Sequence, residues 1–149
     1  MPDHPLDPTE VLQGLERACK SQNSDEIDAA ILAAFQLDHL SSAFGPIFIR
    51  LLVLKCHHKH EDLVQGLQQL RDPDAVSALF DAASVSHEYL AYDEFFGLAR
   101  KCTWALADIG TVAARKRLED LATINNRQIA EYAQKRLDKW EAELHRKKR

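Results

Sequence analysis

The sequence has few of the residues that interrupt helices. Its 149 residues include only 5 glycines and 5 prolines, and aromatic residues make up 7% of the chain. A sheet-rich fold needs more turn residues than this, so their scarcity argues against one. The abundant Ala, Leu, Glu, Gln, Lys and Arg favour helix. We therefore expect an all-α fold.

Long apolar runs are also missing. No segment approaches the roughly 18 apolar residues of a membrane span. The first ten residues carry acids and prolines where a secretory signal carries a basic and then an apolar stretch. We therefore expect a cytoplasmic protein without a membrane partner. We expect one helical-repeat domain over residues 1–149, in which residues 141–149 form a basic C-terminal tail.

Cysteines are few, and no catalytic motif accompanies them. Cys19, Cys56 and Cys102 are an odd number at wide spacings, which indicates buried free thiols. Cys56 precedes His57, but adjacent helical residues point about 100° apart, so adjacency does not pair a thiol with a base. No glycine-rich phosphate loop, serine elbow or paired-carboxylate signature appears. We expect no enzymatic activity and no cofactor.

The net charge of −4 is unevenly distributed. Residues 135–149 contain seven Lys or Arg and three Asp or Glu, which leaves 12 basic and 20 acidic residues in the first 134. Such an acidic body repels phosphate backbones and attracts basic proteins. The distribution favours a basic protein partner, although it also serves simple solubility.

Capping residues indicate where the helices of the first half begin. Asp7-Pro8-Thr9-Glu10 combines an acidic N-cap, a proline at the first helical position and a glutamate three residues after the cap. Further helices are expected near Ser24 and from Pro46, and the apolar helix after Pro46 should form the centre of the core. Apolar spacing then predicts a helix after the polar cluster at residues 57–62, with Leu63, Val64, Leu67 and Leu70 inward. It stops at Asp72-Pro73, where Asp72 can cap and Pro73 can open the following helix.

The second half shows a similar alternation. Residues 84–93 have no helical stripe and indicate a loop of about ten residues, longer than most helix–helix connections. The next helix is expected from Phe95 to Ile109, with Gly110 as its end and Thr111 as the cap of the following helix. A last helix should run from about Arg127 through Trp140 into the tail.

An internal repeat becomes visible when the chain is shifted by 39 residues. The matched positions are Leu67, Leu70, Asp72, Ala75, Leu79 and Ala83 with Leu106, Ile109, Thr111, Ala114, Leu118 and Ala122. Within them, residues 70–76 (Leu-Arg-Asp-Pro-Asp-Ala-Val) and 105–111 (Ala-Leu-Ala-Asp-Ile-Gly-Thr) resemble the turn of short bacterial HEAT repeats. This resemblance implies a HEAT-like α-solenoid of about four helical pairs, clearest over residues 61–139. An unrelated helical bundle is the alternative.

A narrower resemblance covers residues 57–62, 70–73, 87–94 and 100–110. These segments are similar to small bacterial HEAT-like proteins encoded beside polymorphic toxins of the Rhs type, which are presumed immunity proteins. The resemblance implies a protein that neutralises a cognate toxin by covering its active or substrate-binding face. The partner would then be a toxin with a basic surface.

The segment from His57 to Asp62 is the main concentration of metal-capable side chains. On a helix, His57, His60 and Glu61 would fall at i, i+3 and i+4, a spacing that can place ligands on one face. Yet these residues precede a helix, where polar residues normally cap, and the order His-His-Lys-His-Glu lacks the zinc signature of two histidines around a glutamate. We expect no metal, and keep these three residues as weak candidates.

The loop at 84–94 concentrates aromatic and acidic residues. Aromatic anchors rimmed by charge are typical of protein interfaces. The alternative is that Phe95 and Phe96 point inward, while Tyr89 and Tyr92 seal the gap between stacked helices. The expected partner-binding residues are Glu88, Tyr89, Tyr92, Asp93 and Glu94 from the loop, with Glu61 and Asp62 beside them.

Nucleic-acid binding or a general scaffold role is the alternative function. Arg100 and Lys101 lie one predicted helix before Arg115, Lys116 and Arg117, and two such groups would form a basic stripe if they faced each other. The acidic body argues against nucleic acid, and we do not expect it as the partner.

Overall fold

The computed structural model describes residues 6–85 and 87–147, apart from the side chains of Glu88 and Lys147. Every regular element in these ranges is helical, which confirms the all-α prediction. The α-helices are α1 (Pro8–Ser21), α2 (Ser24–Phe35), α3 (Gly45–Leu52), α4 (His60–Leu70), α5 (Val76–Ser84), α6 (Gly97–Ile109), α7 (Val112–Leu121), α8 (Arg127–Asp138) and α9 (Trp140–Lys147). Short 3-10 turns are η1 (Ser42–Phe44), η2 (Pro73–Ala75) and η3 (Glu88–Leu90).

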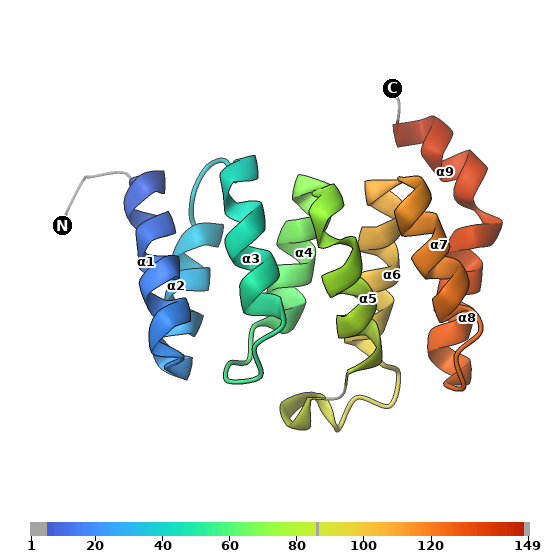
Figure 1. Cartoon of the computed structure of the whole chain (residues 1–149), viewed down its shortest axis with the longest axis horizontal. Coiled ribbons are helices and arrows are strands. Elements are labelled where there is room, and N and C mark those ends of the chain that lie inside the picture. The colour runs from blue at the N-terminus through green and yellow to red at the C-terminus, as the bar shows by residue number, and fades with distance from the viewer. Residues whose placement is uncertain (1–5, 86, 148–149) are drawn as a thin grey trace.

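The helices follow one another along the long axis of the molecule, from α1 at one end to α9 at the other (Figure 1). Consecutive helices pack as α1 on α2, α3 on α4, α5 on α6 and α7 on α8. Alternate helices also contact each other, with α4 on α6, α6 on α8 and α5 on α7. The α3–α4 and α5–α6 connections lie at the same edge of the molecule (Figure 1).

Side-chain caps explain where several helices begin. The Asp7 carboxylate accepts from the backbone N–H of Thr9 at 2.9 Å, and Thr111 Oγ1 accepts from Ala114 N–H at 3.1 Å. Each bond satisfies a backbone donor that the first helical turn leaves free. Asp72 caps η2 in the same way through Asp74 N–H. The predicted caps at these three positions are confirmed.

The offset of 39 residues relates positions that have the same structural role. Asp72 and Thr111 are both N-caps, and Arg71 and Gly110 before them both end a helix in the left-handed region, with φ of 51° and 71°. The apolar members of the two segments are buried or half-buried in one core. The sequence repeat therefore repeats a helix end, a turn and a helix start.

A close helix approach forms part of the core. Gly66 of α4 faces the ring of Phe48, and a Cβ built on Gly66 would lie 2.7 Å from Phe48 Cε2. Phe48 stacks on Phe35 with ring centroids 5.9 Å apart, so α2, α3 and α4 meet there. The sequence predicts that the helix after Pro46 forms the centre of the core, and its apolar side chains are buried or half-buried as far as Leu52. Val53 is exposed because α3 ends before it.

Two predicted helix boundaries are wrong. The helix expected from Phe95 begins at Gly97, because Phe96 adopts φ 53° and ψ 52°, outside the helical region. The last helix divides at Lys139 into α8 and α9. A buried ion pair joins them, with Arg136 Nη1 2.7 Å from Glu143 Oε1. Among the described helices, none combines the length and the apolar character needed to cross a bilayer.

Candidate functional site

His57 is buried in the α3–α4 loop, and both its ring nitrogens are bonded. Its Nε2–H donates to the carbonyl oxygen of Leu51 at 2.7 Å, and its Nδ1 accepts from the backbone N–H of Lys59 at 3.1 Å. A carbonyl oxygen can only accept and a backbone N–H can only donate, so these partners require the neutral tautomer protonated at Nε2. Burial lowers the pKa of His57, which agrees with a neutral ring.

His60, the first residue of α4, is bonded in a similar way. Its Nε2–H donates to the carbonyl oxygen of Leu54 at 2.6 Å. Burial lowers its pKa to about 4, against the raising effect of that bond, so the ring is neutral at pH 7. Its Nδ1 therefore accepts from the Tyr89 hydroxyl at 2.7 Å.

A third histidine completes a stack of three rings, the histidine stack. The ring of His60 lies between those of His57 and His87, at centroid distances of 4.1 Å and 3.8 Å. Burial also lowers the pKa of His87. Because His87 follows α5, the stack joins the α5–α6 loop to the α3–α4 loop. The sequence pattern does not indicate His87 as a member of this stack, because His87 lies 27 positions from His60 and gives no local spacing signal.

The bonding of the weak metal candidates leaves them little capacity to bind a metal. All four ring nitrogens of His57 and His60 already have protein partners. Glu61 turns to another helix, where its carboxylate lies 3.5 Å from Lys101 Nζ. Within the ranges that the structure describes, no three His, Cys, Asp or Glu side chains are grouped to hold a metal ion.

Tyr89 points inward to the histidine stack. Its ring lies 4.7 Å from that of His58, and its hydroxyl also accepts from the backbone N–H of His60 at 3.2 Å. Burial raises its pKa to about 12. This predicted partner-binding residue therefore positions the loop, with its hydroxyl already bonded on both sides.

Three aromatic rings of the same loop face solvent instead. Tyr92 is 81% exposed, Phe95 70% and Phe96 40%. We call residues 92–96 the loop surface. Phe96 has a left-handed backbone, which is uncommon for a bulky residue and concentrates at functional sites. Phe95 and Phe96 thus do not point inward, and Tyr92 does not seal the gap between helices, as the alternative interpretation supposed.

The acids of the loop differ in how they are used. The Asp93 carboxylate accepts from the backbone N–H groups of Phe95 and Gly97, both at 2.9 Å, and so holds the start of α6. Glu94 is exposed. The side chain of Glu88 lies outside the described part of the chain. On α4, Asp62 Oδ2 lies 4.0 Å from Lys59 Nζ, a weak surface contact.

An apolar cavity of about 510 Å³, the loop pocket, lies between the end of α5 and the start of α6. The loop surface contributes Asp93, Glu94 and Phe96 to its wall. Ligand and partner side chains are usually held in cavities that are mostly apolar, with a few polar groups at the edge. The other apolar side chains around it include Ala82, Ala83, Val85, Leu90, Leu98 and Ala99.

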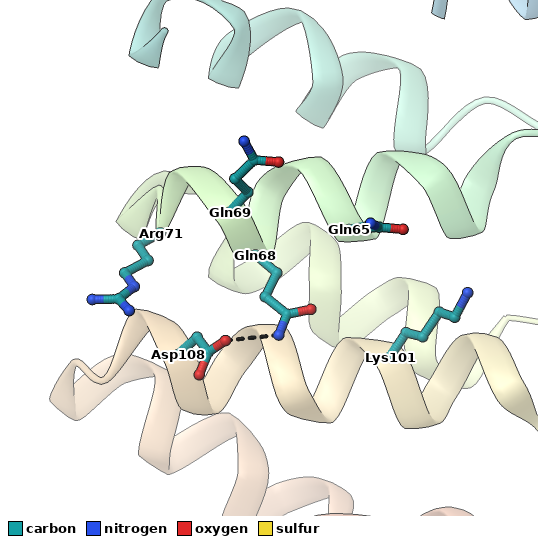
Figure 2. A pocket seen from close by; sticks show the side chains of 6 residues that line it. All are labelled: Gln65, Gln68, Gln69, Arg71, Lys101 and Asp108. Atoms are coloured by element: carbon teal, nitrogen blue, oxygen red, sulfur yellow. Dashed lines mark hydrogen bonds between the residues drawn. The ribbon is translucent and has the colours of Figure 1, made fainter. Parts of the chain in front are cut away.

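A second cavity of about 460 Å³ is more polar and lies between α4 and α6. Figure 2 shows Gln68 and Asp108 meeting across it, with Gln68 Nε2 donating to Asp108 Oδ2 at 2.7 Å. Lys101 and Arg71 lie on opposite sides of this contact (Figure 2). Its amides and mixed charges favour no single class of ligand.

The cysteines show no arrangement for nucleophilic chemistry. All three are free thiols, and Cys102 is fully buried in α6. Burial raises the pKa of the Cys102 thiol, which disfavours the thiolate that nucleophilic catalysis needs. Cys56 precedes His57, but both nitrogens of that ring are bonded elsewhere.

The basic residues of α7 already form ion pairs and cation–π contacts within the protein. Lys116 and Arg117 both pair with Asp120, at 2.9 Å and 3.4 Å. Arg117 also lies over the ring of Phe80, and Arg115 over that of Trp140. A basic stripe for nucleic acid would need these side chains together with Arg100, but each of them already has a partner within the protein.

Comparison of the chain with models of known protein families, with curated proteins and with solved structures finds no match.

Proposed function

We propose that the chain is a HEAT-like α-solenoid that binds another protein and has no catalytic role. Two features support this fold: alternate helices pack along one axis, and the 39-residue offset superimposes caps on caps. Four consecutive pairs, α1–α2 to α7–α8, would then stack, and α9 would cover the end. Repeat proteins of this kind present extended surfaces for partners.

The observation that carries the proposal is the exposure of Tyr92 and Phe95. Both rings project into solvent from a loop that Asp93 and Tyr89 fix in place. Burying an exposed aromatic side chain in an interface contributes roughly 2–3 kcal/mol of favourable transfer free energy. Two exposed rings on a loop whose Asp93, Glu94 and Phe96 line an apolar cavity are typical of protein interaction sites.

The partner we propose is a toxin with a basic surface, encoded beside this chain and inhibited by occlusion in the cytoplasm. The resemblance of residues 57–110 to toxin-adjacent HEAT-like proteins supports this choice. The excess of acids in the first 134 residues supports it too, because opposite charge steers two proteins together. Glu94 on the loop surface would contribute to the acidic rim.

Co-purification with the product of the adjacent gene tests the proposal. We expect Tyr92→Ala and Phe95→Ala each to weaken binding by roughly 30-fold, which corresponds to the 2 kcal/mol of an interface hot spot. Val112→Ala is the matched control, because Val112 is 88% exposed on α7, away from the loop.

Equal loss in all three variants, or no loss in any, contradicts the assignment of the loop surface. A gene neighbourhood with metabolic genes and no toxin gene contradicts the immunity role itself. Binding measured at low and high salt separates the electrostatic part, which screening should reduce.

A further inference from the structure

The groove between α6 and α8 is a site that the proposed function does not use. It encloses about 310 Å³ and is lined by polar and aromatic side chains from both helices. Its lining residues include the cations Arg100, Lys135 and Arg136, the acid Glu131, and Trp104, Gln128 and Tyr132. One wall touches the loop surface, since the Tyr132 hydroxyl donates to the carbonyl of Phe95 at 2.6 Å.

A buried guanidinium forms the floor of this groove. Arg136 is only 3% exposed and is fixed by two contacts. Its Nη1 lies 2.7 Å from Glu143 Oε1, and its Cζ lies 3.5 Å from the centroid of the Trp104 ring. Burying an arginine is costly unless it is paired, so this floor is a built feature of the α6–α8–α9 junction.

Two positively charged side chains at the groove have no ion-pair partner among the described residues. Glu131 pairs with Arg127 at 3.2 Å, and Glu143 pairs with Arg136. Within the described residues, no ion pair involves Arg100 or Lys135, which lie on opposite helices of the groove. The walls therefore carry about two uncompensated positive charges.

We propose that the groove binds a small organic phosphate monoester. The phosphate would lie between Arg100 and Lys135, and the organic part would contact Trp104 and Gln128. A phosphate monoester carries about −1.5 to −2 charges at pH 7, which matches the two free cations, whereas a carboxylate carries half as much. Arginine also binds such groups through two parallel N–H donors. The volume lies at the small end of ligand sites, which suits a compact molecule.

Tryptophan fluorescence provides a direct readout. Trp104 and Trp140 are the two tryptophans of the chain, so Trp140→Phe leaves Trp104 as the sole reporter, at the groove. Phenyl phosphate is the probe, with benzoate as the singly charged comparison. We expect phenyl phosphate to change the Trp104 emission with saturation below about 1 mM, and benzoate to bind at least about tenfold more weakly.

Single charge changes test the geometry. Arg100→Gln and Lys135→Gln should each weaken phenyl phosphate binding about tenfold, and Glu131→Gln should tighten it several-fold by removing a nearby negative charge. Lys116→Gln and Glu119→Gln, on α7, are the matched controls and should change the affinity less than about twofold. All five positions are at the surface, and circular dichroism verifies that the variants fold.

Three results would overturn the proposal. The first is no saturable change up to about 10 mM phenyl phosphate. The second is an equal effect of the groove variants and the α7 controls, which would indicate general screening. The third is tighter binding, by at least about tenfold, of a phosphotyrosine peptide than of phenyl phosphate. The ligand of the groove would then be a phosphorylated protein rather than a small molecule.

Discussion

Acid should destabilise this protein through the histidine stack. His60 has a pKa of about 4 in the native state, chiefly because burial disfavours the charged ring, against 6.5 when exposed. Between these values the unfolded chain binds a proton that the native chain does not, so the free energy of unfolding rises with pH there. The stability is complete above pH 6.5 and is lost as the pH falls toward 4.

The magnitude follows from the difference between the two pKa values. The full shift of His60 corresponds to about 3 kcal/mol, of which about 2 kcal/mol is already lost at pH 5. His57 and His87 act in the same direction, because burial lowers their pKa values too. Domains of this size have only about 5–15 kcal/mol of stability, so the loss is readily measured.

Urea unfolding at pH 7 and pH 5 tests this reasoning in the wild type and in His60→Gln. Glutamine does not titrate and can place an amide donor near the Leu54 carbonyl. It lacks the ring that stacks between His57 and His87, so the variant should be less stable at pH 7. It should then lose about 2 kcal/mol less than the wild type on going to pH 5. His39→Gln, at an exposed histidine, should lose as much as the wild type. Equal losses in His60→Gln and wild type would refute the explanation.

Four further substitutions follow from local geometry. Gly110→Ala should lower the free energy of unfolding by about 1–2 kcal/mol, because only glycine adopts φ 71° without strain. Arg71→Gly, at the equivalent position of the repeat, should leave the free energy of unfolding unchanged or raise it by up to about 1 kcal/mol. Thermal unfolding measures both changes. Gly66→Ala should destabilise by about 1–3 kcal/mol because of its contact with Phe48, a loss visible in urea midpoints. Tyr132→Phe should lower the free energy of unfolding by about 1 kcal/mol, because it removes the hydrogen bond to the Phe95 carbonyl. It should also speed amide hydrogen exchange in residues 92–97 without changing exchange in α1.

Helix positions could be predicted wherever a local chemical signal marks an end. Asp7 and Thr111 cap their helices through their own side chains, so a few residues of sequence suffice to locate them. His60 begins α4 without such a signal, because Lys59 makes no side-chain cap. The division at Lys139 also has no local signal, since neither glycine nor proline is present. It is accompanied by the buried pair of Arg136 and Glu143, which joins the two helices.

The candidate site shows the same limit more clearly. Aromatic and acidic residues mark the loop in the sequence, but their directions depend on distant partners. Tyr89 turns inward because His60, 29 positions away, supplies an acceptor for its hydroxyl. Phe96 stays out of α6 because the Asp93 carboxylate bonds the N–H of Gly97. The first relation spans 29 positions and has no periodicity that sequence reasoning can use, whereas the second is local and spans four residues.

Together these contacts show how a long loop can act as a preformed surface. Tyr89 attaches it to the histidine stack, Asp93 attaches it to α6, and Tyr132 holds the carbonyl of Phe95 from α8. Ordering a loop on binding costs roughly 0.5–1.5 kcal/mol for each side chain that becomes fixed, and a loop already attached at three points avoids part of that cost. Because one attachment depends on the neutral form of His60, acid should weaken the proposed partner binding before it unfolds the helices.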